Sequence, residues 1–533
     1  MRPSKLAAFQ LTLFLAACVP AVQVDISSAA PVPASTPSNN KASLPTLYIA
    51  SPVPSALRAE ASKWDILPGD DPNSAAIILD LAQSAKPDSI WIYALVAPFP
   101  TVTDDISAGD LLDFWHGLGT GPFAGAPLWM TESTLAAFSI AWGRPAPGIV
   151  MTVSEDNLVD TVWAATPSWA IVPFEDLEPR LKVLSVDGNS PVRKDFNQST
   201  YPLVLGFELN NSSFALPATN RDSSKMTIVM LTGVTALVRG TAAKMERYGL
   251  TYPGEDIRDI LLASDILHIN NEVPFYSLCD VPDPKKRELV FCSRVKYMEL
   301  LKDIDTDVVE LTGDHFADYG RQAMLETLQD YKDAGIPYYG GGANSEEARK
   351  PLLVEHNGNK IAFIGCDAKA AYATADETMP GNALCDYNYM REQIQKLRAQ
   401  GYIVIATFQY EEYTTPKAPP AQMEKFRWQA DSGANIVSGS QAHFAQVMEF
   451  HNGAFIHYGL GNLFFDQMGD THGFDNIRQE FADSHVFYNG HYISTAIQTF
   501  MLMDYSRPRP MEPVERAKFL RYYFEQSGWM VSP

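Results

Sequence analysis

The residues with the clearest capacity for chemistry stand in one short segment, Thr312-Gly-Asp-His315. Residues 307–311 before it are apolar and predict a short strand. Residues 321–334 after it have apolar side chains at helical spacing, with Gly335 placed to end the helix. An open α/β sheet presents its ligands at the carboxyl ends of its strands. We therefore expect the aspartate and the histidine of this turn to face a functional site.

Other polar residues follow further predicted strands and suit acid–base chemistry. An imidazole titrates near neutral pH, so a histidine beside carboxylates is a candidate general acid or base. A guanidinium binds a carboxylate with two hydrogen bonds, which makes Arg239 the candidate anion clamp. As a hypothesis, His315 moves the proton and Asp314 orients it. The candidate catalytic residues are His315, Asp314, His443, Glu412 and Glu272, and the candidate substrate-binding residues are Arg239, Asn270, Gln409, Tyr410, Gln441 and Asn462.

Alternating apolar runs and helical patterns predict an α/β fold in two domains, residues 46–222 and 226–504. In the first domain we expect strands that include 90–97 and 169–172, and helices at 73–85 and 108–115. In the second domain the expected strands are 228–231, 266–269, 307–311, 361–364, 402–407, 435–437 and 455–458, and the expected helices are 254–263, 295–304, 321–334, 389–400 and 421–432. Residues 505–533 predict a tail that is irregular at first and then forms a helix at 514–524.

The charge of the chain argues against nucleic acid as a partner. The sequence has 41 Lys and Arg against 63 Asp and Glu, a formal net charge of −22 at pH 7. Such a field repels polyanions unless a local basic patch overrides it, and no such patch is evident in the sequence. An anionic polymer would therefore depend on Arg239 and nearby cations for its attraction.

The N-terminus predicts a processing signal. Arg2 and Lys5 precede an apolar run that ends in Leu15-Ala-Ala-Cys18, which resembles a bacterial lipoprotein signal. The resemblance implies cleavage before Cys18, lipidation of its thiol and an extracytoplasmic chain that lipid holds to the bacterial cell membrane. An ordinary secretory signal is the alternative. Residues 19–45, rich in Ala, Ser and Pro, predict a flexible tether.

Four further cysteines remain, and an exported chain with an even number of cysteines favours disulfides. Three pairings are open. We favour the sequence neighbours, Cys279 with Cys292 and Cys366 with Cys385, each closing a short loop. A zinc site is the competing interpretation, although none of the four stands in a C-x-x-C pair.

Polar blocks follow one another in a specific order across residues 226–504. They are Gly233 to Arg239, Asn270-Asn-Glu272, Thr312 to His315, Gly340 to Asn344, Phe408 to Tyr413, Gly439 to His443 and Tyr458 to Asp466. This order resembles the CapA family of poly-gamma-glutamate capsule synthesis proteins. The resemblance implies a layered α/β fold of the calcineurin-like metallophosphoesterase type and a role in making, exporting or trimming a cell-surface polymer such as poly-gamma-glutamate. Its implied partners are that polymer or its precursor and a membrane synthase complex.

The chain departs from the family pattern at Val234, Asp314, Phe408 and Gln441. Two-metal hydrolysis needs several oxygen or imidazole ligands on each ion, and valine and phenylalanine have no lone pair to offer. We therefore expect no pair of metal ions and no certain cofactor; one divalent cation on Asp314, His443 and Glu272 is the alternative. An enzyme of this kind would be a hydrolase, transferase or epimerase of amide-linked units. The alternative function is a non-catalytic binding lipoprotein for an anionic ligand or a cell-wall fragment.

The first domain has a resemblance of its own. Residues 95–104 and 182–191, with Tyr201-Pro-Leu203, are similar to the phosphate-binding branch of periplasmic solute-binding proteins. The resemblance implies a substrate-binding-protein-like fold for residues 46–222, and it does not place a ligand there.

Overall fold

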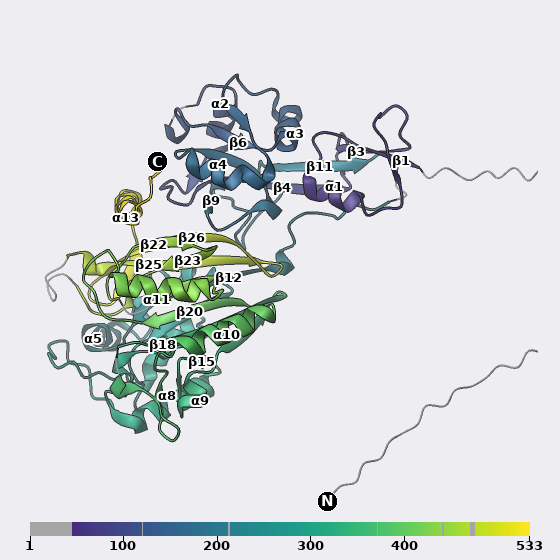
Figure 1. The fold of residues 1–533 in the computed structure, drawn as a ribbon. Coiled ribbons are helices and arrows are strands. Elements are labelled where there is room, and N and C mark those ends of the chain that lie inside the picture. The colour runs from purple at the N-terminus through teal and green to yellow at the C-terminus, as the bar shows by residue number, and fades with distance from the viewer. Residues whose placement is uncertain (1–44, 120, 212–213, 370, 440–441, 469–474) are drawn as a thin grey trace, which may run out of the picture. The chain divides into compact units, whose positions relative to one another are not determined.

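The computed structural model describes residues 45–119, 121–211, 214–369, 371–439, 442–468 and 475–533 (Figure 1). Residues 45–533 form one compact unit. The predicted lipoprotein signal with Cys18, the predicted tether up to residue 44 and the candidate residue Gln441 lie outside the described residues. Within the described ranges, every helix is too short or too polar to cross a bilayer.

The first sheet is built around β4 (Ser89–Pro98), whose apolar residues are buried on both faces, as in a central strand. A helix predicted at 73–85 is wrong. Strand β3 (Ile77–Leu81) lies there instead, because Ile77 and Leu79 alternate inward with the period of a strand. The strand order is β2-β1-β3-β11-β4-β8-β6-β7, with β9 also on β4. The other strands are β1 (Thr46–Ile49), β2 (Leu67–Pro68), β6 (Leu128–Met130), β7 (Val150–Thr152), β8 (Trp169–Pro173), β9 (Leu181–Val183) and β11 (Val204–Leu209), and the helices are α1 (Ser55–Ala61), α2 (Ala108–Trp115), α3 (Glu132–Trp142) and α4 (Leu158–Ala164).

Two further sheets pack face to face. One has the order β15-β14-β13-β12-β25-β26-β27 with β24 beside β12, and the other has the order β17-β18-β20-β21-β23-β22. Leu231 of the first and Phe363 and Ile405 of the second share one buried core. The strands are β12 (Met226–Thr235), β13 (Ile266–Asn271), β14 (Val308–Glu310), β15 (Tyr338–Tyr339), β17 (Leu352–His356), β18 (Asn359–Asp367), β20 (Ile403–Gln409), β21 (Ile436–Gly439), β22 (Met448–His451), β23 (Ala454–His457), β24 (Asn462–Phe464), β25 (Gln479–Tyr488), β26 (His491–Met503) and β27 (Arg507–Pro510).

Helices cover the outer faces of both sheets. Met245 of α5 and Met324 of α8 pack on one outer face, and Ile394 of α10 and Phe426 of α11 pack on the other, where Figure 1 shows α10 and α11 together. The result is an α/β/β/α layering, so the predicted α/β class is confirmed. The helices are α5 (Arg239–Tyr248), α6 (Arg258–Leu262), α7 (Met298–Asp303), α8 (Gly320–Ala334), α9 (Ser345–Ala348), α10 (Tyr387–Ala399) and α11 (Pro420–Asp431).

The tail contributes to the second sheet and to the core. Residues 507–510, predicted to be irregular, form β27 and pair with β26. The predicted helix is confirmed as α13 (Pro513–Gln526), which starts with a capping box between Glu512 and Glu515. Its Phe519 and Tyr523 are buried in the core between the sheets.

Candidate functional site

The parallel strands β12, β13 and β14 end at the same edge of their sheet, and this register brings the candidate residues together. Asn270 stands opposite Glu310 in the ladder. Directly after β14, a Cβ atom built on Gly313 would lie 2.4 Å from the backbone oxygen of Glu272. Only glycine fits this approach, so Gly313 allows Asp314 to lie next to Glu272.

His443 is held between acceptors. Its Nε2 lies 3.3 Å from Oε1 of Glu272 and 4.0 Å from Oε1 of Glu412, and its Nδ1 lies 2.7 Å from Oδ1 of Asn462. Burial alone would lower the pKa of His443, but Glu272 and Glu412 outweigh it and raise the pKa to about 9. Burial would raise the pKa of Glu272, but His443, His315 and Lys369 lower it to about 2. The structure thus brings Glu272, Glu412 and Asn462 together around His443.

Lys369 joins the same cluster and was not among the candidates. Its Nζ lies 2.6 Å from Oδ2 of Asp314 and pairs with the carboxylate of Glu412. Gln409 donates to the other oxygen of Asp314 at 3.1 Å. The sequence signal for Lys369 is its position two residues after Asp367, which ends β18. Strand β18 runs parallel to β20, so both strands end at the same edge of their sheet. Burial lowers the pKa of Lys369, but Asp314 and Glu412 raise it overall.

His315 is oriented by a different carboxylate from the one expected. Its Nδ1 lies 2.7 Å from Oδ2 of Asp318, three residues on in the chain, and Asp314 is bound to Lys369 and Gln409. The hypothesis that Asp314 orients His315 is therefore corrected to Asp318. The same oxygen of Asp318 accepts a hydrogen bond from the backbone of Phe291 at 2.7 Å. Burial lowers the pKa of His315, but the hydrogen bond to Asp318 and the nearby carboxylates raise it overall.

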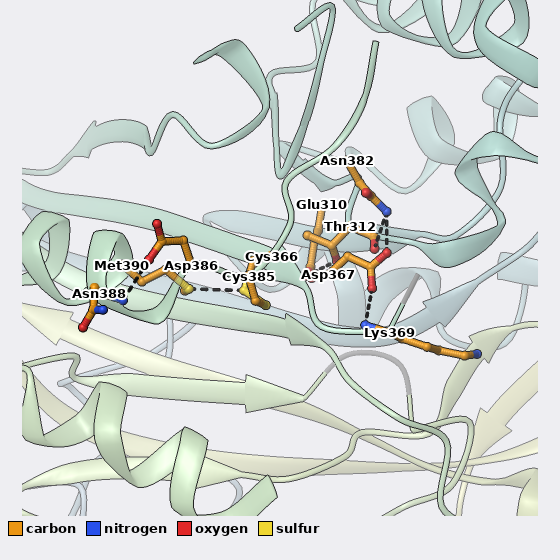
Figure 2. The surroundings of a disulfide bond; sticks show 10 residues. All are labelled: Glu310, Thr312, Cys366, Asp367, Lys369, Asn382, Cys385, Asp386, Asn388 and Met390. Atoms are coloured by element: carbon orange, nitrogen blue, oxygen red, sulfur yellow. Dashed lines mark hydrogen bonds between the residues drawn. A yellow bond between two sulfur atoms is a disulfide. The ribbon is translucent and has the colours of Figure 1, made fainter. Parts of the chain in front are cut away.

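Both predicted disulfides are present and lie beside the site. Cys279 pairs with Cys292 and Cys366 with Cys385, so the zinc interpretation of these cysteines is wrong. Figure 2 shows buried Asp367 next to the second bridge, between the side chain of Asn382 and the backbone nitrogen of Lys369. The Asn382 amide also reaches the backbone oxygen of Gly313 at 3.2 Å. These hydrogen bonds hold residues 367–369 against the turn that carries Asp314.

Arg239 is engaged inside the protein. Its guanidinium binds Asp466 at 2.5 Å and lies over the rings of Phe291 and Phe465. Arg239 also lines a pocket of about 570 Å³ with the loop that the Cys279–Cys292 bridge closes. Three consecutive basic residues of that loop, Lys285, Lys286 and Arg287, line the pocket. Asp280, Asp283 and Glu288 share the same lining.

The other predicted binding residues differ in their placement. Asn462 holds His443, and Gln409 holds Asp314. Asn270 is fully buried, and neither atom of its amide has a hydrogen-bond partner among the described residues. Tyr410 packs edge-on against Phe426 of α11. Both Arg239 and His443 adopt left-handed backbone with φ of 41° and 47°, an uncommon conformation for such residues that concentrates at functional sites.

One divalent cation fits part of this cluster. An oxygen of Glu272, an oxygen of Asp314 and a ring nitrogen of His315 all lie within 4.8 Å of one another. The predicted ligand set had His443 in place of His315. A cation bound there would polarise a substrate oxygen. Val234 and Phe408 are fully buried and have no coordinating atom. The expectation that no pair of ions binds here stays a prediction.

The layering and the polar strand ends define an α/β sandwich with its site at the carboxyl edge of both sheets. Residues 228–467 match the family described as bacterial capsule synthesis protein PGA_cap. The capsule biosynthesis protein CapA of Bacillus anthracis is 27% identical over 273 residues, which are 50% of this chain and 66% of the relative. The PGA biosynthesis protein CapA of Bacillus subtilis (strain 168) is 27% identical over 213 residues, 40% of this chain and 56% of the relative. The match thus spans less than two thirds of either relative.

Two solved structures show weaker likenesses. A 5'-nucleotidase precursor from Thermus thermophilus aligns with 56% of this chain and 59% of its own, at 11% identity and a TM-score of 0.34. An ABC-type phosphate transport receptor from Vibrio cholerae aligns with 32% of this chain and 88% of its own, at 14% identity and a TM-score of 0.26. Scores this low do not identify a fold, so the solute-binding resemblance of residues 46–222 stays a prediction.

Proposed function

We propose that this protein acts in the synthesis, export or trimming of an anionic cell-surface polymer such as poly-gamma-glutamate. The match of residues 228–467 to the capsule synthesis family supports this role, as do two relatives named for capsule and PGA biosynthesis. The proposed location is the outer side of the bacterial cell membrane, with a lipid anchor on Cys18. The two disulfides support an oxidising compartment.

The arrangement of His443 carries the chemical part of the proposal. Both of its ring nitrogens face oxygen acceptors, those of Glu272 and Asn462, and this favours the doubly protonated ring. Such a ring is a general acid. Glu412 lies 4.0 Å away with a side chain that is 42% exposed, where a carboxylate can take a proton from water.

Acid and base together suit cleavage or transfer at an amide bond. The Glu412 carboxylate takes a proton from the attacking water or amine, a new bond forms to the carbonyl carbon, and His443 protonates the leaving nitrogen as the old bond breaks. Three basic residues, Lys285, Lys286 and Arg287, line the pocket beside Arg239 and would attract an anionic chain to a protein of net charge −22. Asp280, Asp283 and Glu288 of the same lining weaken this attraction.

A gene deletion in the native host tests the role in the polymer. We expect the deletion to change the amount or chain length of the surface polymer, and the wild-type gene but not the His443→Gln gene to restore it. The readout is the size and glutamate content of polymer extracted from the cell surface. Unchanged polymer in the deletion strain would overturn the proposed role.

A non-catalytic binding lipoprotein is the second candidate. The observation that favours it is the pair Val234 and Phe408, buried apolar side chains where the family pattern has polar ones. Restoration of the polymer by the His443→Gln gene, with tight calorimetric binding of glutamate oligomers and no cleavage, would decide for this function.

A further inference from the structure

Lys369 occupies an unusual place for a lysine, among the acidic side chains of the candidate site. Its Nζ lies 2.6 Å from Oδ2 of Asp314, and it also pairs with Glu412. The lysine side chain is 22% exposed and that of Asp314 is 6% exposed. The ammonium is therefore largely withdrawn from solvent, in contrast to the exposed lysines that form most surface ion pairs.

The segment that carries this lysine is anchored at several points. The backbone nitrogen of Lys369 donates to buried Asp367 at 2.7 Å, and that of Ala368 donates to the backbone oxygen of Gln409 at 2.8 Å. Cys366, three residues before Lys369, is tied to Cys385. These anchors direct the side chain toward Asp314 and limit the alternatives open to it.

Asp314 also belongs to the group that fits a divalent cation, together with Glu272 and His315. A divalent ion on this carboxylate and the Lys369 ammonium on the same carboxylate would be like charges only a few ångströms apart. Their repulsion is strong in a site that excludes most water, so the two compete for Asp314.

We propose that Lys369 is a built-in cation, which supplies at Asp314 and Glu412 the positive charge that a metal ion would supply and keeps the affinity of the site for divalent cations low. An ammonium has three N–H donors, and among the described residues Asp314 and Glu412 use two of them. The third remains for a carbonyl or carboxylate oxygen of a bound substrate. This inference rests on the geometry of the candidate site and not on the proposed role in polymer synthesis.

Cation affinity measured without substrate tests the inference. Mn²⁺ and Zn²⁺ are titrated separately into the purified full chain by calorimetry, and bound metal is counted by mass spectrometry after dialysis. We expect Lys369→Met to bind Mn²⁺ at least about tenfold more tightly than wild type, because the competing charge is gone. Lys369→Arg keeps the charge and should stay within about threefold of wild type.

Control variants separate the loss of competition at Asp314 from other effects of a substitution on Mn²⁺ affinity. Lys360→Met removes an exposed lysine at the other end of β18 and should leave the affinity unchanged. Adding Asp314→Asn to Lys369→Met should abolish the gained affinity. Thermal unfolding identifies any variant that fails to fold, and Lys369→Gln then replaces Lys369→Met.

Two results would overturn the inference. Equal Mn²⁺ affinity of wild type and Lys369→Met would show that the lysine does not compete for Asp314. Absence of binding to both proteins at millimolar Mn²⁺ would show that these carboxylates are no cation site and that Lys369 replaces nothing. Neither result bears on the phenotype of the deletion strain. An unchanged polymer in that strain likewise does not bear on the cation affinities, so each proposal can fail while the other stands.

Discussion

At the scale of single residues, the balance between burial and neighbouring carboxylates decides which histidines carry charge. His443 keeps its proton because acidic neighbours surround it. His268 and His485 are buried in the sheets, and burial lowers their pKa to about 3 and about 4. A histidine is thus protonated at the edge of the sheet and neutral in the interior.

Because His268 and His485 are neutral in the folded protein, its stability depends on pH. In the unfolded chain each has its ordinary pKa of 6.5, so between that value and its folded pKa the unfolded state binds one more proton. Their stabilising contribution is present above pH 6.5 and is lost as the pH falls toward 4. Each histidine contributes a fall in the free energy of unfolding, measured with urea, of up to about 1.4 kcal/mol per pH unit. The carboxyls of Glu175 and Asp176, whose pKa burial raises to about 7 and about 8, act in the opposite direction. The contribution of a histidine is therefore measured as a difference between wild type and a variant.

The variant His485→Gln provides the control for that prediction. It removes one of the two titrating groups, so the slope of stability against pH between 6 and 4.5 should be shallower by up to about 1.4 kcal/mol per unit. A slope equal to that of wild type would mean that His485 is protonated in the folded protein.

At the scale of elements, glycine at strand ends determines how closely the site residues approach. Gly313→Ala would place a methyl group 2.4 Å from the backbone oxygen of Glu272. We expect the variant to lose about 3 kcal/mol of unfolding free energy and any activity that depends on Asp314. Gly335→Ala is the comparison, since its Cβ meets nothing and only its left-handed φ of 72° costs about 1 kcal/mol. Equal losses in the two variants would contradict the steric argument.

The bridge between Cys366 and Cys385 closes a loop with a sequence separation of 19 beside the Lys369 segment. Replacing both cysteines by serine should lower the free energy of unfolding by about 3 kcal/mol, because the unfolded chain gains freedom. Denaturant unfolding measures the loss, and reduction of the wild-type protein should reproduce part of it. A double variant as stable as wild type would show that the loop is fixed by other contacts.

Local periodicity predicted the elements with one clear buried face. Helix α8 and its Gly335 cap, α10, α11 and most parallel strands lie within a few residues of their expected ranges. The hairpin of β25 and β26 was missed, because Gln, Asp, Ser and Thr residues interrupt its apolar residues. The site was predicted where polar residues directly follow predicted strands. Lys369 was missed because its position two residues after the end of β18 is a weak signal without the packing of Asp314 and Glu412 around it.

At the scale of the whole molecule, the tail joins sequence-distant segments. Arg516 of α13 binds Asp104 at 2.6 Å across 412 residues, and Lys182 binds the same carboxylate at 2.7 Å. Burial lowers the pKa of Lys182 to about 8. A domain boundary placed at residue 504 on sequence grounds would separate β27 and α13 from the sheet and core they complete.

Removal of residues 513–533 should therefore destabilise the rest of the chain. It exposes the pocket that Phe519 and Tyr523 fill, and fully burying one such side chain is worth about 2 kcal/mol. We expect the truncated protein to melt at least about 5 °C lower than the full chain and to bind more of a hydrophobic dye. An identical melting curve would show that α13 is dispensable. Arg516→Ala, which removes only the ion pair, should cost much less.

The backbone of Ser532 and Pro533 pairs with residues 100–103. A polypeptide is synthesised from its N-terminus, so this pairing cannot form until residue 533 has left the ribosome. The segment around residue 100 is therefore made long before its partner and stays unpaired during the synthesis of the residues between them.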